Sequence, residues 1–191
     1  ELINAVLDQP ISSETFPYMS CASVGVLGEL GRLFRISFSG EHAYEIAIPS
    51  RYGESLFRLL VSRAEEMGGG PYGMEALNVL RLEKGFITHA EIHGRVTAFD
   101  LGMQRMVSEK KDCIGKTSAA RPGLLDSERE QLIALKPVGP IKQIVAGAHL
   151  FDLNDEPLRQ NDKGYVTSVG FSPTFGHFIG LGFLKNGQVR L

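Results

Sequence analysis

The chain has 191 residues, of which 43% are hydrophobic, and a globular protein of this size buries roughly 70% of the surface that its unfolded form exposes. That is enough for one large domain or two small ones. Its 20 basic and 22 acidic residues give a net charge of -2, which disfavours nucleic acid or an anionic membrane as a partner. The only cysteines, Cys21 and Cys113, form no CxxC pair, so the sequence predicts a reduced, cytoplasmic protein without a zinc site.

The chain opens with ELINAVLDQP, which is helix-like and lacks Met at position 1. This opening favours the interpretation that the chain was cut from a longer polypeptide. It also lacks the basic and then apolar regions of a targeting signal. No apolar run approaches the roughly 20 residues that a membrane-spanning helix needs, so we expect no membrane partner.

Alternating apolar residues predict two strands, over residues 34–39 and 44–48. Gly40, in the intervening SGEH, allows a tight reversal. We therefore expect an antiparallel hairpin with one apolar and one polar face. The apolar residues at every second position are Phe34, Ile36, Phe38, Tyr44, Ile46 and Ile48.

Two helices are expected next. The first begins near Ser50, a residue type that caps helices, and ends near Met67 before three glycines. The second runs over residues 71–84 and is apolar nearly all round, which is typical of a buried helix. Arg81 falls among its apolar residues on the helical wheel, so its guanidinium needs an anion or several hydrogen-bond acceptors.

The stretch THAEIHGR contains His89, Glu91 and His93 at alternate positions. Two histidines four apart can share a metal on a helix, but the flanking glycines and the β-branched residues favour a strand or turn. The HExxH order of zinc hydrolases is also absent. We expect a loop over a pocket or an edge strand here, with a metal site as the less favoured alternative.

After Lys116 the pattern changes to short strand-like runs separated by Gly and Pro. The runs are QLIALKPV, HLFDL, GYVTSVGFS and FIGLGFL, a pattern typical of a small antiparallel barrel or sandwich. We place a boundary near residue 122. Residues 1–122 are expected to form a two-layer α+β domain, incomplete at its N-terminus, and residues 123–191 an all-β domain.

Glu45 has two interpretations. By alternation it faces away from Tyr44 and Ile46, which is typical of an ordinary solvent-facing residue. Alternatively, a carboxylate held on a strand presents two acceptors side by side, which matches the paired N–H donors of an amidine-like edge such as that of a pterin. Phe38 and Tyr44 flank the turn and could contact a flat ring.

Four segments together resemble a known family. FRISFSGEHAYEIAIPSRYGE, PYGMEALNVLRLEKGFI, DLGMQRMVSEKKDCIGKTS and GYVTSVGFSPTFGHFIGLGFL follow, in order and spacing, the glycine cleavage T-protein (aminomethyltransferase) family. Within this family GMEALNVLRLEKGF and RMVSEKKDCIGK are most similar to the α subunits of heterotetrameric sarcosine oxidases. The resemblance implies an α+β fold in which a ferredoxin-like folate-binding domain precedes a small antiparallel β-barrel.

The resemblance also implies site residues. Glu45 matches the glutamate that grips the pterin edge of tetrahydrofolate, Phe38 falls where relatives carry a tyrosine near the folate, and Arg81 matches an arginine of the folate site. Tyr44 is included as an aromatic neighbour. His89 stands where relatives carry an aromatic residue, so a titratable contact replaces a stacking one. The family's catalytic aspartate belongs to a part that this sequence lacks, so no catalytic residue is assigned.

As an activity, the resemblance implies that the chain binds tetrahydrofolate and positions it to accept the one-carbon unit of oxidised sarcosine, giving 5,10-methylenetetrahydrofolate. FMN, FAD and NAD would bind other domains or subunits, and the partners would be the other sarcosine oxidase subunits and the rest of the same polypeptide. Three alternatives stay open: a glycine-cleavage aminomethyltransferase with a lipoyl carrier protein, a non-catalytic assembly module, and an RNA-binding ferredoxin-like module. The near-neutral charge disfavours the last.

Overall fold

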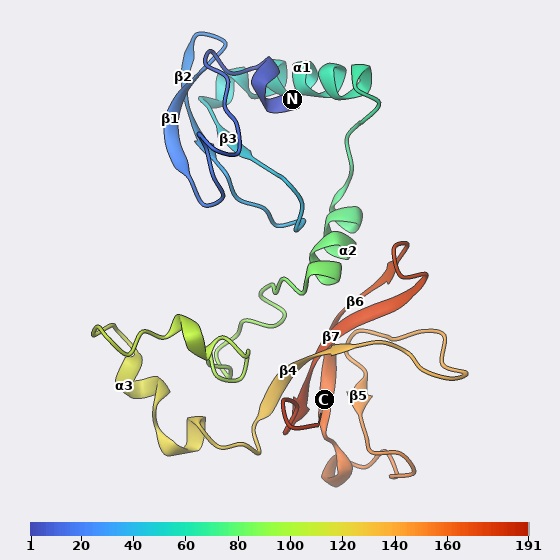
Figure 1. Cartoon of the computed structure of the whole chain (residues 1–191). Coiled ribbons are helices and arrows are strands. Elements are labelled where there is room, and N and C mark those ends of the chain that lie inside the picture. Colours follow the sequence, from blue (N-terminus) through green and yellow to red (C-terminus); the bar gives the residue numbers. More distant parts are fainter. Residues whose placement is uncertain (191) are drawn as a thin grey trace. The chain divides into compact units, whose positions relative to one another are not determined.

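A computed structural model describes residues 1–190 of the chain. The chain forms two compact units, Glu1–Asn78 and Val79–Leu191, and each is described by itself (Figure 1). Both units combine helices with antiparallel strands. None of the helices within residues 1–190 is long and apolar enough to cross a membrane.

The first unit contains a three-stranded antiparallel sheet in the order β1-β2-β3. Its strands are β1 (Cys21–Val26), β2 (Glu29–Phe34) and β3 (Glu45–Ala47). A two-residue turn joins β1 to β2, and both turn residues have positive φ, 51° at Leu27 and 82° at Gly28. Such a turn has the twist that an antiparallel hairpin requires. The Asp8 carboxylate accepts a hydrogen bond of 2.9 Å from the Gly28 N–H and so fixes the turn.

The hairpin expected over residues 34–48 is wrong in its first strand and in its turn. β2 ends at Phe34, and residues 35–44 form a loop before β3. The cause is a contact distant in sequence: the backbone of Arg35 bonds to Met19 and Ser20, which precede β1, and residues 35–44 leave the ladder. Phe34 lies directly opposite Glu45, so the two residues share one face of the sheet.

The first expected helix is confirmed as a 3-10 turn, η2 (Ser50–Tyr52), followed by α1 (Gly53–Glu66). Its apolar side packs on the inner face of the sheet (Figure 1). A short 3-10 helix, η1 (Leu2–Ala5), joins the same core. The buried centre of this core is Val6, Val26 and Leu56, and the residues packed around it are Ile3, Leu7, Val24, Ile46, Ile48, Leu59 and Leu60.

The second helix is α2 (Met74–Lys84), and the expectation that it is buried all round is wrong. Met74 is 77% exposed, and within the helix only Arg81 and Leu82 are buried. Its last turns belong to the second unit and pack on β6 (Gly164–Ser172) there. A Cβ placed on Gly170 would lie 3.2 Å from the side chains of Val79 and Leu82. An apolar wheel shows what a helix can bury, whereas only neighbouring elements decide what it does bury.

The second unit ends in a four-stranded antiparallel sheet, in the order β4-β7-β6-β5. The strands are β4 (Glu130–Leu135), β5 (His149–Leu150), β6 (Gly164–Ser172) and β7 (His177–Lys185), so each predicted strand-like run overlaps one. The buried hydrophobic residues of this sheet are Ile133, Val166, Leu181 and Phe183. The short helices that precede or interrupt the sheet are η3 (Gln104–Met106), α3 (Lys116–Ala119), η4 (Pro122–Leu124) and η5 (Arg159–Asn161).

Candidate functional site

Glu45 lies on the face of the first sheet that points away from the core. The ladder places it opposite Phe34, and Arg32 and Ala47 form the next pair on the same face. Glu45 and Arg32 are exposed, and Phe34 is half-buried. Among residues 1–190 the Glu45 carboxylate has neither a hydrogen bond nor an ion pair. A free pair of acceptor oxygens therefore stands on a strand beside an aromatic ring.

The loop of residues 35–44 leads into this position. The Tyr44 hydroxyl forms a hydrogen bond of 3.0 Å with Nε2 of His42. The Tyr44 ring lies 5.0 Å from the guanidinium carbon of Arg35 and 6.5 Å from the ring of Phe16. Phe38 is 41% exposed. Tyr44 is thus held by its neighbours, whereas a large part of the Phe38 ring faces outward.

Arg35 is a residue of this region that the sequence analysis did not single out. Alternation placed it on a polar, outward face, but it is only 9% exposed. Its Nε is buried and has no hydrogen-bond partner among the described residues. A buried donor without an acceptor is costly, so the Nε of Arg35 marks the loop as a place that suits an additional polar group. The sequence carries no signal of this burial, because Arg35 stands at a regular polar position in the alternation of residues 34–39.

Arg81, in the second unit, is buried as the helical wheel predicts, and it has protein partners. Its guanidinium donates 2.8 Å to Ser168 Oγ and 3.1 Å to the carbonyl of Phe86, and one of its nitrogens lies 3.7 Å from a carboxylate oxygen of Glu91. Glu91 is fully buried. The anion that Arg81 was expected to need is therefore supplied by Glu91.

Glu91 joins its own turn to the end of α2 and to β6, which is distant in sequence. Its oxygens accept hydrogen bonds from the N–H and hydroxyl of Thr88, at 2.8 and 3.1 Å, and from Ser168 Oγ on β6, at 2.5 Å. Burial raises the pKa of Glu91, but the hydrogen bonds outweigh it and hold the net pKa below the ordinary value. Burial lowers the pKa of Arg81, which the charge of Glu91 opposes.

His89, Glu91 and His93, the alternative metal ligands of the sequence analysis, do not point toward a common centre. His89 is exposed, Glu91 is buried against Arg81, and Nε2 of His93 lies 3.1 Å from the hydroxyl of Tyr165. Within residues 1–190 no group of three or more His, Cys, Asp or Glu side chains is arranged to hold a metal ion. The stretch forms a turn, as the flanking glycines favoured.

The predicted folate residues fall into two groups. Phe38, Tyr44 and Glu45 are close in sequence and belong to the first unit, whereas Arg81 and His89 belong to the second. Phe34 and Arg32, which share the face of Glu45, were not predicted, because strand register depends on a loop length that alternation does not reveal. In the second unit, Arg81 is part of a buried ion pair with Glu91, and His89 is an exposed imidazole.

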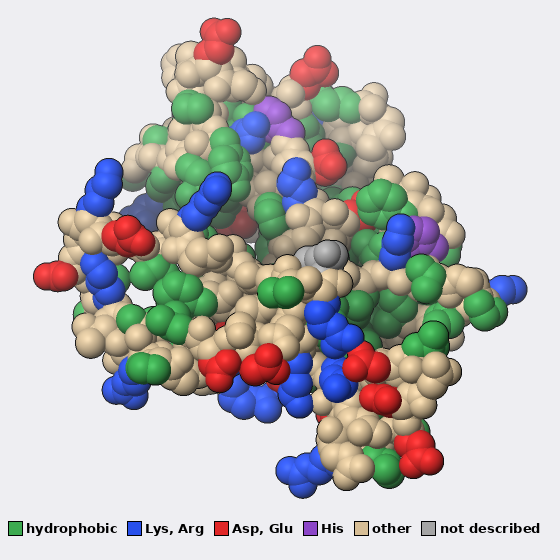
Figure 2. Space-filling view, turned by 60° about the horizontal axis from the view of Figure 1, so that its bottom comes forward, with side chains coloured by type: hydrophobic (Ala, Val, Ile, Leu, Met, Phe, Trp, Pro, Cys, Tyr) green, Lys and Arg blue, Asp and Glu red, His purple; other side chains and the backbone are tan. Residues whose placement is uncertain are grey.

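Electrostatics narrow the class of ligand. Lys, Arg, Asp and Glu side chains are intermixed over the face that Figure 2 shows, without a broad basic patch. Together, the fold and the site features define an α+β protein with a C-terminal antiparallel sheet, and its exposed carboxylate suits contact with a neutral, donor-bearing group of a ligand better than contact with an anionic group.

Comparison with known families identifies the fold. Residues 1–111 match the GCVT N-terminal domain, and residues 131–191 match the glycine cleavage T-protein C-terminal barrel domain. The chain therefore belongs to the glycine cleavage T-protein family. The predicted α+β class with a C-terminal barrel domain is confirmed, and the boundary near residue 122 stays a prediction.

Individual relatives are of two kinds. The chain is 41% identical over 192 residues to the sarcosine oxidase subunit alpha of Rhizobium meliloti, which covers 99% of this chain and 20% of that protein. It is 28% identical to the aminomethyltransferase of a Thermoanaerobacter species, covering all of this chain and 50% of that protein. The crystal structure of aminomethyltransferase T from Bartonella henselae matches with a TM-score of 0.66 at 28% identity, over 81% of this chain and 42% of that one.

The chain thus spans about a fifth of the matched sarcosine oxidase subunit and about half of the matched aminomethyltransferase. The resemblance that the four sequence segments indicated is confirmed at the level of the family and of its sarcosine oxidase relatives.

Proposed function

We propose that this chain is the tetrahydrofolate-binding part of a sarcosine oxidase α subunit, and that its folate accepts the one-carbon unit of sarcosine to give 5,10-methylenetetrahydrofolate. The proposal is supported by the sarcosine oxidase relatives, which match nearly the whole chain at up to 41% identity. The observation that carries it is the exposed Glu45 carboxylate, unpaired among residues 1–190.

The residues present fit a pterin. Its 2-amino-4-oxopyrimidine edge offers parallel N–H donors, and Glu45 offers two acceptor oxygens with no competing partner. The ring of Phe34, directly opposite Glu45, gives an apolar surface for a flat ring. We assign Phe38 and Tyr44 as further folate contacts. Arg81, which is buried and paired with Glu91, and His89 belong to the second unit, and their part in folate binding stays a prediction from the sequence. The orphaned Nε of Arg35, beside Tyr44, is a donor that a bound ligand or a neighbouring segment would satisfy.

The rest of the proposed assembly lies outside this chain. Oxidation of the amine would occur at a flavin, with FMN, FAD and NAD bound by other domains or by other subunits of a cytoplasmic complex. Keeping the reactive one-carbon unit away from water until it meets the folate would preserve it and raise its effective concentration. In this arrangement the chain binds and orients the folate and shields the one-carbon unit from water.

Titration calorimetry with 5-formyltetrahydrofolate tests the proposal. Glu45→Gln preserves the size of the side chain but removes its charge and one acceptor, and loss of a charge-assisted pair weakens binding by roughly 1.5–3 kcal/mol, about tenfold or more. Glu41→Gln is the matched control, because Glu41 is also exposed but lies in the loop, outside the face of β3. Equal affinities of Glu45→Gln and the unmodified protein would refute the assignment of Glu45.

The aminomethyltransferase relatives support a second candidate function, transfer of an aminomethyl group from a lipoyl carrier protein. It uses the same folate contacts, so folate titration does not separate the two functions. An assay with aminomethyl-lipoyl carrier protein, on the longer polypeptide that supplies the catalytic aspartate, does: turnover would favour this candidate, and its absence, together with folate binding, would favour the sarcosine oxidase assignment.

A further inference from the structure

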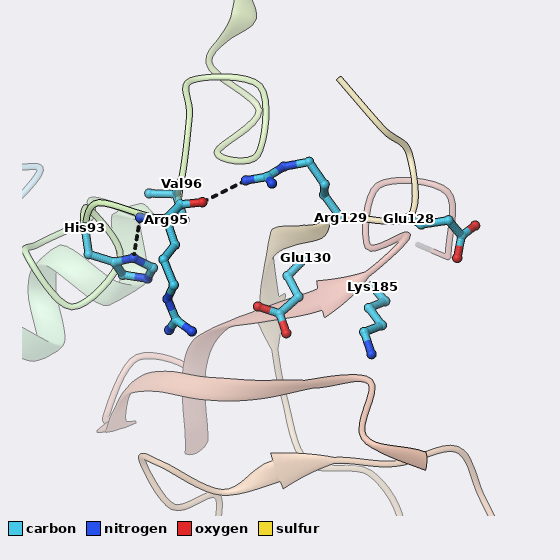
Figure 3. Close-up of a pocket in the computed structure, with 7 residues that line it drawn as sticks. All are labelled: His93, Arg95, Val96, Glu128, Arg129, Glu130 and Lys185. Atoms are coloured by element: carbon cyan, nitrogen blue, oxygen red, sulfur yellow. Dashed lines mark hydrogen bonds between the residues drawn. The ribbon is translucent and has the colours of Figure 1, made fainter. Parts of the chain in front are cut away.

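The second unit contains a hollow that the proposed function does not use. It has a volume of about 300 Å³ and lies between the turn of residues 93–96, the start of β4 and the end of β7 (Figure 3). This volume is at the lower end of the range for ligand pockets. Of the seven lining residues only Val96 is apolar. We call it the polar hollow, and its lining suits a small polar molecule.

Two lining residues of the polar hollow, His93 and Arg95, are held in place by Tyr165, which is not itself one of the seven lining residues. Nδ1 of His93 accepts a bond of 3.3 Å from the Arg95 N–H, which leaves the ring proton on Nε2 to donate to the Tyr165 hydroxyl at 3.1 Å. The Arg95 guanidinium also donates to that hydroxyl, at 3.4 Å, and lies 6.0 Å from the ring. The Tyr165 oxygen therefore accepts twice, and its own proton remains available for an acceptor.

Several other polar groups of the lining are already engaged. Arg129 is paired with Asp100 at 2.7 Å and donates to the carbonyl of Arg95, as the dashed line in Figure 3 marks. The Lys185 ammonium donates to the carbonyl of Asp162, and a Glu128 oxygen accepts from Asn186, each at 2.9 Å. These groups shape the polar hollow but have less capacity for a ligand.

Glu130 is the exception among the acidic residues of the polar hollow. It is half-buried at the first position of β4, directly opposite Lys185 in the ladder, and Figure 3 shows its carboxylate directed into the space between Arg95 and Lys185. Within residues 1–190 it forms neither a hydrogen bond nor an ion pair of 4.0 Å or less. Once Arg129 is neutralised by Asp100, the lining holds two basic and two acidic side chains, so its charges balance.

We propose that the polar hollow binds a small zwitterion of the α-amino acid class. The carboxylate of the ligand bonds to the free N–H groups of Arg95, which Tyr165 holds in place, and the ligand's ammonium bonds to Glu130. A simple anion would lie against Glu130 and a simple cation against Arg95, so only a molecule with both charges satisfies both groups. The site lies entirely in the second unit and does not depend on folate binding.

Glycine is the smallest probe of this class, and saturation-transfer NMR with calorimetry on the 191-residue chain measures its binding. A site this small and open predicts a dissociation constant on the order of millimolar. Acetate and methylammonium each carry one of the two charges and are expected to bind at least about tenfold more weakly. Acetate binding as tightly as glycine would overturn the zwitterion proposal, as would the absence of saturable glycine binding at tens of millimolar.

Variants locate the binding. Glu130→Gln and Arg95→Gln are each expected to weaken glycine about tenfold or more, and Tyr165→Phe to weaken it by a smaller factor. Glu156→Gln, an exposed acidic residue of the same unit outside the polar hollow, is the matched control and should leave binding unchanged. Glycine affinity that survives Glu130→Gln and Arg95→Gln in folded protein would place the binding elsewhere and overturn the proposal.

Discussion

Two buried arginines of this protein differ in their partners. Arg81 is 3% exposed and meets a carboxylate, a hydroxyl and a carbonyl, whereas Arg35 is 9% exposed and its Nε has no partner among residues 1–190. Breaking a buried pair leaves an uncompensated charge, while removing a cation without an acceptor leaves none. The two residues should therefore respond differently to the same substitution.

Arg81→Met is expected to destabilise the second unit by about 3–5 kcal/mol, because Glu91 stays buried without its cation. Arg35→Met should cost the first unit about 1 kcal/mol or less, mostly from its lost contact with Tyr44. Hydrogen exchange read by mass spectrometry gives the opening free energy of each unit separately. Adding Glu91→Gln to Arg81→Met removes the buried charge but keeps an acceptor for Thr88 and Ser168, so it should recover a large part of the loss, and a lack of recovery would contradict the ion-pair explanation.

The pKa of Glu91 gives a pH dependence with a definite sign. Burial raises the pKa, but the hydrogen bonds lower it by more than burial raises it. The net pKa in the folded state therefore lies below the ordinary 4.5. Stabilisation from a depressed carboxylate pKa is complete above the unfolded value and is lost as the pH falls through the folded value. The second unit should therefore lose stability below about pH 4.5, and Glu91→Gln should flatten that decline.

Urea unfolding between pH 6 and pH 3 measures this slope. Asp100 contributes in the same direction, because its burial raises the pKa and its bonds to Arg129 and Thr97 outweigh that effect. The stability of Glu91→Gln should therefore still fall with decreasing pH, but less steeply than that of the unmodified protein. An identical slope in both proteins would show that Glu91 is not the titrating group.

At the scale of elements, sequence patterns predicted the second sheet better than the first. GYVTSVGFS coincides with β6, and FIGLGFL covers all of β7 except its first and last residues. A short connection with Pro and Gly joins the two strands, so local signals mark it. The pairing of β2 with β3 depends on the loop of residues 35–44. The first residue of this loop, Arg35, bonds through its backbone to Met19 and Ser20, which precede β1 in the sequence. A non-local contact of this kind leaves no mark in the alternation of apolar residues.

The same distinction separates the candidate site residues. Arg81 was predicted to be buried because a helical wheel is a local property, and its burial is confirmed. Its partners, Glu91 and Ser168, come from a turn and from a strand 87 residues away, at an irregularity of β6 that follows Val166. A bulge changes the direction of side chains and is not visible in a two-residue period, so Ser168 was not predicted as a partner. Glu91 was not predicted either, because it lies in a turn.

At the scale of the whole molecule, the segment GGGPYG between α1 and α2 is the place where the chain should be most accessible. Residues 68–73 are all exposed, and the division between the two compact units follows at Asn78. Tyr72, within the segment, is 62% exposed. Exposed segments outside helices and strands are the preferred sites of proteolytic cleavage. Limited chymotrypsin treatment should therefore cut after Tyr72 first.

N-terminal sequencing and mass spectrometry of the products test this expectation. The first new N-terminus should be Gly73, and the fragments of residues 1–72 and 73–191 should persist, because each keeps a sheet with its own buried residues. Tyr72→Ser removes the cleavage site and should slow the first cut. Simultaneous degradation of both parts, without an intermediate, would mean that neither unit holds its structure once the segment between α1 and α2 is cut.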